Sequence, residues 1–255
     1  MPFFFSLIGT SIRASLSLRL AFFVELILMI GNNLIFFLIW WIFFNKFKRV
    51  GGWVFDDLVV MMAIVRGGYG LARVFFGGTK TLARTITGGG LDPFMTQPKN
   101  LLLYLLGSKS QSKGWGHIVS AIILYVLIDI TRVQTILMLL GIICSCLIFT
   151  SVSVIAHSMC FWFGNVGEVS KKYVDSIFLF VHYPVNIYSG LLQVFMFTLF
   201  PAGLIGYLPV ELLKSFSWTM CLSLIGATVI FIALAFATFY SGLRRYESGN
   251  LFTSH

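Results

Sequence analysis

The stretch "LILMIGNNLIFFLIWWIFFN", Leu26–Asn45, decides the fold class of this chain. It contains no Asp, Glu, Lys or Arg, and a membrane-spanning helix needs about 20 consecutive, mostly apolar residues. The whole chain has the same character, since 58% of its 255 residues are hydrophobic and 11% are charged. Soluble domains carry about 25% charged residues. We therefore expect an all-α, polytopic membrane protein with lipid as its solvent.

Five further apolar stretches extend this pattern to six predicted spans. In order, the spans are Leu26–Asn45, Phe55–Phe76, His117–Ile130, Val133–Phe163, Asn186–Phe200 and Ser215–Gly242. The uncharged run Ser176–Val210 is too long for one straight span, and prolines interrupt it at 184, 201 and 209. We expect Pro201–Leu213 to form a re-entrant hairpin near the outer surface, shielded by protein or facing a water-filled vestibule.

Residues 1–20 predict an amphipathic helix that precedes the membrane domain of residues 21–255. Polar and apolar side chains form two stripes at helical spacing: Ser6, Thr10, Arg13 and Ser17 on one face, and Phe4, Ile8, Ile12 and Leu16 on another. This pattern is typical of a helix that lies in the membrane interface. The alternative is that this segment is the start of the first span.

The net charge of +9 bears on orientation. Eleven Lys and Arg residues fall in the predicted segments on the N-terminal side of the membrane and five in those on the other side. Because cytoplasmic loops are enriched in basic residues, we expect a multi-pass protein with both termini in the cytoplasm. The basic residues are then explained by topology, and we expect no nucleic-acid partner.

The segment 79–98, "TKTLARTITGGGLDPFMTQP", interrupts the apolar pattern on the predicted cytoplasmic side. A short helix ends at three glycines, Asp92 and Pro93 suit the start of a second helix, and Pro98 breaks the chain again. Leu91, Phe94 and Met95 are apolar residues in an aqueous location. We therefore predict a docking element for a cytoplasmic partner; the alternative is a plain connector.

Arg66 and Arg73 lie within the second predicted span and, seven residues apart, share one helix face. An Arg at the bilayer centre costs about 2.5–3.5 kcal/mol on insertion scales, whereas a Leu or Phe returns only about 0.3–0.6 kcal/mol. We expect this face to line a translocation path or an intersubunit contact. The alternative is that Arg73 reaches the cytoplasmic surface and Arg66 pairs with a carboxylate such as Glu25.

The stretch "GGGLDPFMTQPKN" resembles the G-x-L-D-x-x-L-T-x-P-x-N pattern of ABC type-2 permeases. The matching residues are Gly89 or Gly90, Leu91, Asp92, Thr96, Pro98 and Asn100. Four further stretches occur along the chain in the order typical of that family: "GGW" after the first span, then "YPVNIYSG", "FPAGLIGYLP" and "GLRRYESGN". Two departures are Gly89, where the family commonly has a polar or charged residue, and Arg66, which is unusual in the second span.

The resemblance implies an exporter permease with six spans, an N-terminal connecting helix and a cytoplasmic coupling helix, located in the bacterial cytoplasmic (inner) membrane. It implies a dimer with an identical or homologous permease. It also implies separate ABC ATPase subunits that hold ATP and Mg, so that this chain is no enzyme, has no catalytic residue and binds no cofactor or metal itself. The residues expected to contact the ATPase are Gly90, Leu91, Asp92, Phe94, Met95, Thr96 and Pro98.

Two other function classes compete with this interpretation. A secondary transporter or channel would use Arg66, Arg73, Glu25 and Asp129 as its polar pathway and would predict repeats with interrupted helices in matching positions. A membrane-embedded enzyme would need a cluster of acid, base or metal-ligating residues. The sequence contains no convincing repeat and no such cluster, and it does not reveal the cargo.

Overall fold

The computed structural model describes residues 2–16, 19–97 and 99–246. Within these ranges every regular element is helical, as predicted, and an isolated bridge joins Val50 to Trp53. The elements are α1 (Pro2–Leu16), α2 (Arg19–Phe47), α3 (Phe55–Phe75), α4 (Thr79–Thr87), α5 (Asp92–Met95), α6 (Leu101–Gly107), α7 (Lys113–Val126), α8 (Arg132–Ser158), α9 (Cys160–Phe163), α10 (Gly167–Phe180), η1 (Val185–Ile187), α11 (Leu191–Phe195), η2 (Gly203–Tyr207), α12 (Leu208–Lys214) and α13 (Trp218–Leu243).

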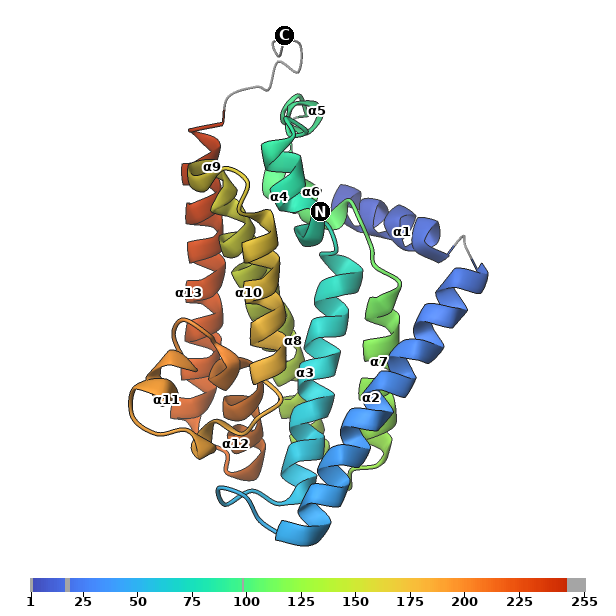
Figure 1. Ribbon diagram of the computed structural model, residues 1–255, viewed down its shortest axis with the longest axis vertical. Helices are drawn as coiled ribbons and strands as arrows, with labels where there is room; N and C mark the ends of the chain where they lie inside the picture. Colours follow the sequence, from blue (N-terminus) through green and yellow to red (C-terminus); the bar gives the residue numbers. More distant parts are fainter. Residues whose placement is uncertain (1, 17–18, 98, 247–255) are drawn as a thin grey trace.

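Four stretches of helix are long and apolar enough to cross a membrane: α2, α3, α8 together with α9, and α13. They confirm four of the predicted spans and show a multi-pass membrane protein. The shorter helices α7 and α10 run alongside them in the bundle (Figure 1). With 14 residues each, they are about 21 Å long, less than the thickness of the hydrocarbon core, about 30 Å. A count of six spans stays a prediction.

Helix α3 lies at the centre of the bundle and packs on α7 and α8. Glycines permit the close approach on both sides. A Cβ atom added to Gly68 would lie 2.5 Å from the Cβ of Ser145 in α8, and one added to Gly70 would lie 2.9 Å from the carbonyl oxygen of Gly114 in α7. Such small residues let membrane helices approach closely where no hydrophobic effect drives them together.

The predicted span Asn186–Phe200 is wrong. This stretch contains the one-turn element η1, the five-residue helix α11 and irregular chain. The helix that joins the bundle here is instead α10, whose first three turns carry Lys171, Lys172 and Asp175. A search for uncharged stretches missed α10 because this helix contains charged residues. One of them, Asp175, is accommodated in the bundle by an ion pair with Arg73 of α3.

The predicted hairpin within Pro201–Leu213 is also wrong, because residues 202–214 form one continuous helical arm in which the π-helix η2 leads into α12. Pro209 lacks the N–H group that would bond to the carbonyl of Ile205 one turn earlier. That carbonyl accepts a hydrogen bond from the Ser145 hydroxyl of α8 at 2.6 Å instead. A proline is therefore tolerated here because a neighbouring helix satisfies the freed carbonyl.

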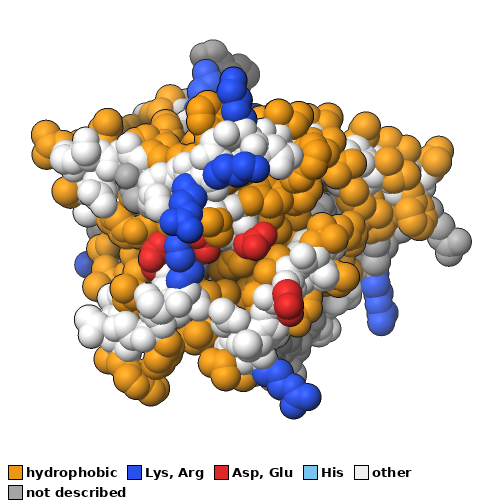
Figure 2. Space-filling model, turned by 90° about the horizontal axis from the view of Figure 1, so that it is seen from below, with side chains coloured by type: hydrophobic (Ala, Val, Ile, Leu, Met, Phe, Trp, Pro, Cys, Tyr) orange, Lys and Arg blue, Asp and Glu red, His pale blue; other side chains and the backbone are white. Residues whose placement is uncertain are grey.

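A group of polar and aromatic side chains fastens this arm to the turn between α2 and α3. The indole Nε1 of Trp53 donates a hydrogen bond to Glu211 at 2.7 Å, and its ring stacks on Tyr207 with 5.4 Å between centroids. Lys214 forms an ion pair with Asp57 at 2.9 Å. Figure 2 shows this end of the molecule, where apolar side chains surround a few basic and acidic ones.

The other end of the bundle carries α1, α4, α5, α6 and the end of α13 (Figure 1). Helix α1 confirms the predicted N-terminal helix and lies across the axis of the long helices. It packs on α6, with Ile8 buried and the Ser11 hydroxyl donating to the carbonyl of Gly107 at 3.1 Å. Of its predicted polar stripe, Ser17 lies outside the described residues. Both described ends of the chain are thus on one side of the bundle.

Labelling of introduced cysteines tests which side is cytoplasmic. All four native cysteines are buried, so they give little background. We expect Arg49→Cys, in the exposed turn after α2, to react with a membrane-impermeant maleimide on intact cells. Thr87→Cys, exposed at the end of α4, should react only after permeabilisation. The reverse pattern would contradict the predicted orientation.

The contact between α3 and α8 is tested by adding one methyl group. Gly68→Ala places a Cβ atom 2.5 Å from Ser145, and such overpacking destabilises by about 1–3 kcal/mol. We expect a lower Tm in detergent for this variant. The matched control is Gly226→Ala in α13, where an added Cβ meets nothing within 4 Å. Equal Tm values for the two variants would show that α3 and α8 are not in this close contact.

Candidate functional site

The segment from α4 to α6 connects α3 to α7 and forms the tip of the molecule at the end that carries α1 (Figure 1). Helix α4 is amphipathic, and its apolar face buries Leu82, Ala83 and Ile86. These residues share one apolar cluster with Val154 of α8 and Phe239 of α13. The segment is therefore a packed extension of the bundle and not a loose connector.

Glycines shape both ends of α4. At its start, the amide of Gly78 donates to the carbonyl of Leu106 at 3.0 Å, and a Cβ atom at Gly78 would lie 1.9 Å from the carbonyl oxygen of Leu105. The backbones of α4 and α6 thus meet without a side chain between them. After α4, Gly89 has a φ of 69°, which glycine adopts without steric penalty. This conformation accounts for a glycine where the family commonly has a polar or charged residue.

The apolar residues predicted to contact a partner differ in exposure. Leu91 is 0% exposed and belongs to the chain's own apolar cluster, so it supports the tip from inside instead of presenting a contact surface. Phe94 is half-buried, and its ring lies 4.9 Å from that of Tyr104 in α6. Met95 is 50% exposed. Because a docking surface needs accessible apolar area, Met95 offers more surface for the predicted contact than the other two residues.

The remaining predicted contact residues surround α5. Thr96 is exposed and Gly90 is half-buried, whereas Pro98 lies outside the described residues. Helix α5 begins at Asp92, and no side chain caps it. The Asp92 carboxylate instead accepts a hydrogen bond from the hydroxyl of Tyr246 at 3.1 Å. Asp92 therefore does not cap α5 as predicted, and its hydrogen bond with Tyr246 connects the tip to the chain that follows α13.

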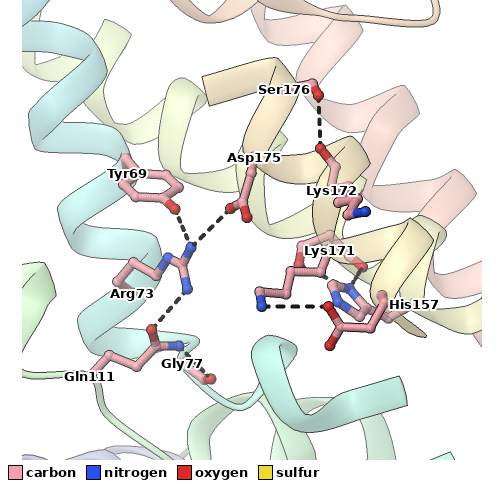
Figure 3. A network of polar contacts seen from close by, with 11 residues as sticks. Tyr69, Arg73, Gly77, Gln111, His157, Lys171, Lys172, Asp175 and Ser176 are labelled. Carbon is pink, nitrogen blue, oxygen red and sulfur yellow. Dashed lines mark hydrogen bonds and ion pairs between the residues drawn. The ribbon is translucent and has the colours of Figure 1, made fainter. Parts of the chain in front are cut away.

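Arg73 is the centre of a polar network at the end of α3 that is nearer the tip (Figure 3). Its guanidinium contacts the Tyr69 hydroxyl, donates to the side-chain oxygen of Gln111 at 2.8 Å and forms an ion pair with Asp175 at 3.9 Å. Gln111 in turn donates to the carbonyl of Gly77 at 2.9 Å. Arg73 therefore joins α3, α10 and the chain before α7. The alternative that Arg73 simply reaches the surface did not predict these contacts.

Sequence reasoning missed the partners of Arg73. Asp175 belongs to a helix that the charge pattern had hidden, and Gln111 lies in the irregular chain before α7. The available signal was the charged group Lys171, Lys172 and Asp175, spaced so that the first and last share a helix face. Such a pattern on a membrane helix predicts a polar partner, but it does not identify that partner.

A basic pocket of about 100 Å³ lies beside this network. Its polar lining includes Arg73, Lys80 of α4, and Lys171 and Asp175 of α10. Partial burial lowers the pKa of the Lys80 ammonium, and the positive charges of Arg73, Lys113 and Lys171 lower it further. A second pocket of about 170 Å³ shares Lys80 and Lys171 with the first. Basic side chains therefore gather at the end of the bundle next to the tip.

Arg66 faces the interior of the protein, as predicted. Its side chain is 2% exposed, and its guanidinium lies over the ring of Phe36, 5.8 Å from the centroid. Glu25, the carboxylate proposed as its counter-ion, instead accepts a hydrogen bond from the Ser112 hydroxyl. The alternative pairing of Arg66 with Glu25 is therefore wrong.

The polar pathway required by a secondary transporter is not assembled. Arg73 forms an ion pair with Asp175, and Glu25 accepts a hydrogen bond from Ser112. Asp129 is exposed in the connection between α7 and α8. Arg66 contacts none of these carboxylates. The four residues of that hypothesis thus belong to separate environments.

Comparison with known proteins agrees with the resemblance found in the sequence. The model of a family described as "ABC-2 family transporter protein" matches residues 28–250. Neither the comparison with curated proteins nor that with solved structures gave a match. The family match extends from α2 to the chain that follows α13 and includes the tip and the Arg73 network. This chain therefore belongs to the ABC-2 transporter family of membrane proteins.

Proposed function

We propose that this chain is the membrane-spanning permease subunit of an ATP-driven exporter. It forms the translocation path with a second permease, identical or homologous, and separate ABC ATPase subunits bind ATP and Mg and hydrolyse the nucleotide. The chain lies in the bacterial cytoplasmic membrane with both termini in the cytoplasm, and α7 and α10 complete six spans. Family membership supports the transport role, and the structure of the tip supports the coupling.

The observation that carries the proposal is an exposed tip attached firmly to several long helices. Met95 and Thr96 present accessible surface, while the adjacent α4 packs on α8 and the glycine contact ties it to α6. Asp92 connects the tip to Tyr246 after α13. A force applied by a partner at α5 is thereby passed to α3, α8 and α13 without first deforming a flexible loop.

The secondary transporter and channel have less support than a coupled permease. They need a continuous set of polar groups across the membrane, whereas the chain places its acidic and basic residues in separate contacts. They also leave the packed tip without a role. A coupled permease uses both features, since the Arg73 network holds the inner ends of α3 and α10 together and the tip offers a partner access to them.

Met95→Asp tests the coupling role. The exposed position tolerates the charge in the free permease, but a docked ATPase would bury it without a partner, which is unfavourable. We expect ATPase recovery in a co-purification to fall about tenfold or more. The Tm and the membrane insertion of the permease should remain those of the native protein.

Met95→Leu is the matched control, since it keeps the apolar surface and should retain the ATPase. Phe94→Asp is less informative, because Phe94 packs on Tyr104 and its replacement also damages the tip itself. An unchanged yield of ATPase with Met95→Asp would contradict docking at α5.

A further inference from the structure

Arg66 is a buried cation for which the described part of the chain supplies no counter-ion. None of its nitrogen atoms takes part in an ion pair or hydrogen bond with the described residues, and its Nε is buried without a partner. Arg73, two helical turns away, has a carboxylate, an amide and a hydroxyl around it. A buried charge without compensation is strongly unfavourable, so Arg66 calls for a negative partner.

The polar residues close to Arg66 do not provide that partner. His117 and His182 lie within electrostatic range of the guanidinium, but a histidine side chain is either neutral or cationic. Asn33 donates its amide to Ser120 at 2.8 Å, and Ser120 donates to the carbonyl of Gly116 at 2.7 Å. Asn33, Ser120 and Gly116 are thus hydrogen-bonded to one another, whereas the Nδ1 atom of His117 is buried without a partner. None of these groups carries a negative charge.

Arg66 lines a cavity of about 240 Å³ between α2, α3 and α7. Apart from Arg66, Asn33 and Ser120, the walls of this cavity are apolar, and they include Leu34 and Ile123. A neutral ligand would leave the charge of Arg66 uncompensated, whereas a small hydrophilic anion would leave the apolar walls unmatched. The lining therefore fits a ligand that has one acidic group and an apolar body.

A second cavity, of about 300 Å³, continues toward the turn between α2 and α3, and its lining is apolar except for Asp56. It shares Phe37 and Leu127 with the first cavity and is also lined by Trp41 and Phe55. Phe55 precedes Arg66 by eleven residues on α3, which corresponds to about 16 Å along the helix axis. Arg66 thus lies at one end of a long, mostly apolar groove, and Asp56 lies near the other end. An amphipathic anion likewise has its acidic group at one end and an apolar chain beyond it.

We propose that this groove binds an amphipathic anion, with its carboxylate or phosphate on the guanidinium of Arg66 and its apolar chain between α2, α3 and α7. A guanidinium binds a carboxylate or phosphate through two parallel hydrogen bonds, and a site screened from water strengthens the attraction. The inference rests on the proposed function where it treats this anion as the cargo, and it deepens that function by naming the substrate class. The same chemistry could also come from a resident anionic lipid.

The test measures binding of a fluorescent fatty acid, cis-parinaric acid, and of its uncharged methyl ester. The full-length permease is placed in phosphatidylcholine nanodiscs, and energy transfer from tryptophan reports occupancy. We expect the acid to bind about tenfold more tightly than the ester, because only the acid pairs with Arg66. Equal affinities in the native protein would overturn the inference without the need for any variant.

Variants assign this preference to Arg66. Arg66→Gln should abolish the preference for the acid, and Arg66→Lys, which keeps the positive charge, should retain part of it. Arg132→Gln removes one exposed positive charge at the start of α8 and should leave the preference unchanged. A preference for the acid that survives in a folded Arg66→Gln protein would place the anion elsewhere and overturn the inference.

Two further arms separate cargo from resident lipid. Displacement of the acid by phosphatidylglycerol would identify a membrane lipid as the occupant and still support the anion site. Resistance to phosphatidylglycerol, together with release of the acid when ATP is added to the permease–ATPase complex, would identify the cargo. Binding to the permease alone requires no ATPase, so a failure of this test and a failure of docking at Met95 are distinguishable.

Discussion

The constraint on which the structure depends is that the membrane interior offers no water to satisfy a polar group. Every donor, acceptor or charge placed there must find a partner in the protein, and the chain repeatedly provides one from another helix. The carbonyl freed by Pro209 is satisfied by Ser145 of α8, and the indole of Trp53 is satisfied by Glu211 of α12. A few buried polar atoms lack a partner among the described residues, and Arg66 is the one of these residues that carries a full charge.

Small residues and polar contacts stabilise different parts of the helix bundle. Glycines on α3 let α7 and α8 approach, and because lipid tails are as apolar as leucine, such close packing has to supply attraction between helices. Polar networks then fix the ends: Trp53, Tyr207 and Glu211 at one end, Arg73 and Asp175 at the other. Polar contacts thus hold α3 to α12 at one end and to α10 at the other.

The sequence predicted the helical class, four of the long spans, the N-terminal helix and the position of the tip, because each depends on a local pattern. It failed over 167–214. Uncharged runs there suggested a span where the chain is irregular. Charged residues concealed α10, because a charged helix can join the bundle when its charges meet a partner on another helix. Within the tip, sequence alone could not separate the buried Leu91 from the exposed Met95, because both are apolar residues in one short segment.

The sequence by itself determined that the protein is embedded in lipid, where its four long apolar helices lie and which family it belongs to, because composition, apolar runs and motif order are properties of the chain. The tertiary structure decided which polar residues are paired. Arg66 and Arg73 look equivalent along α3. Arg73 forms an ion pair with Asp175, whereas Arg66 forms none with the described carboxylates. The physical reason is that electrostatic compensation in a medium of low dielectric depends on distances between helices, which no stretch of sequence contains.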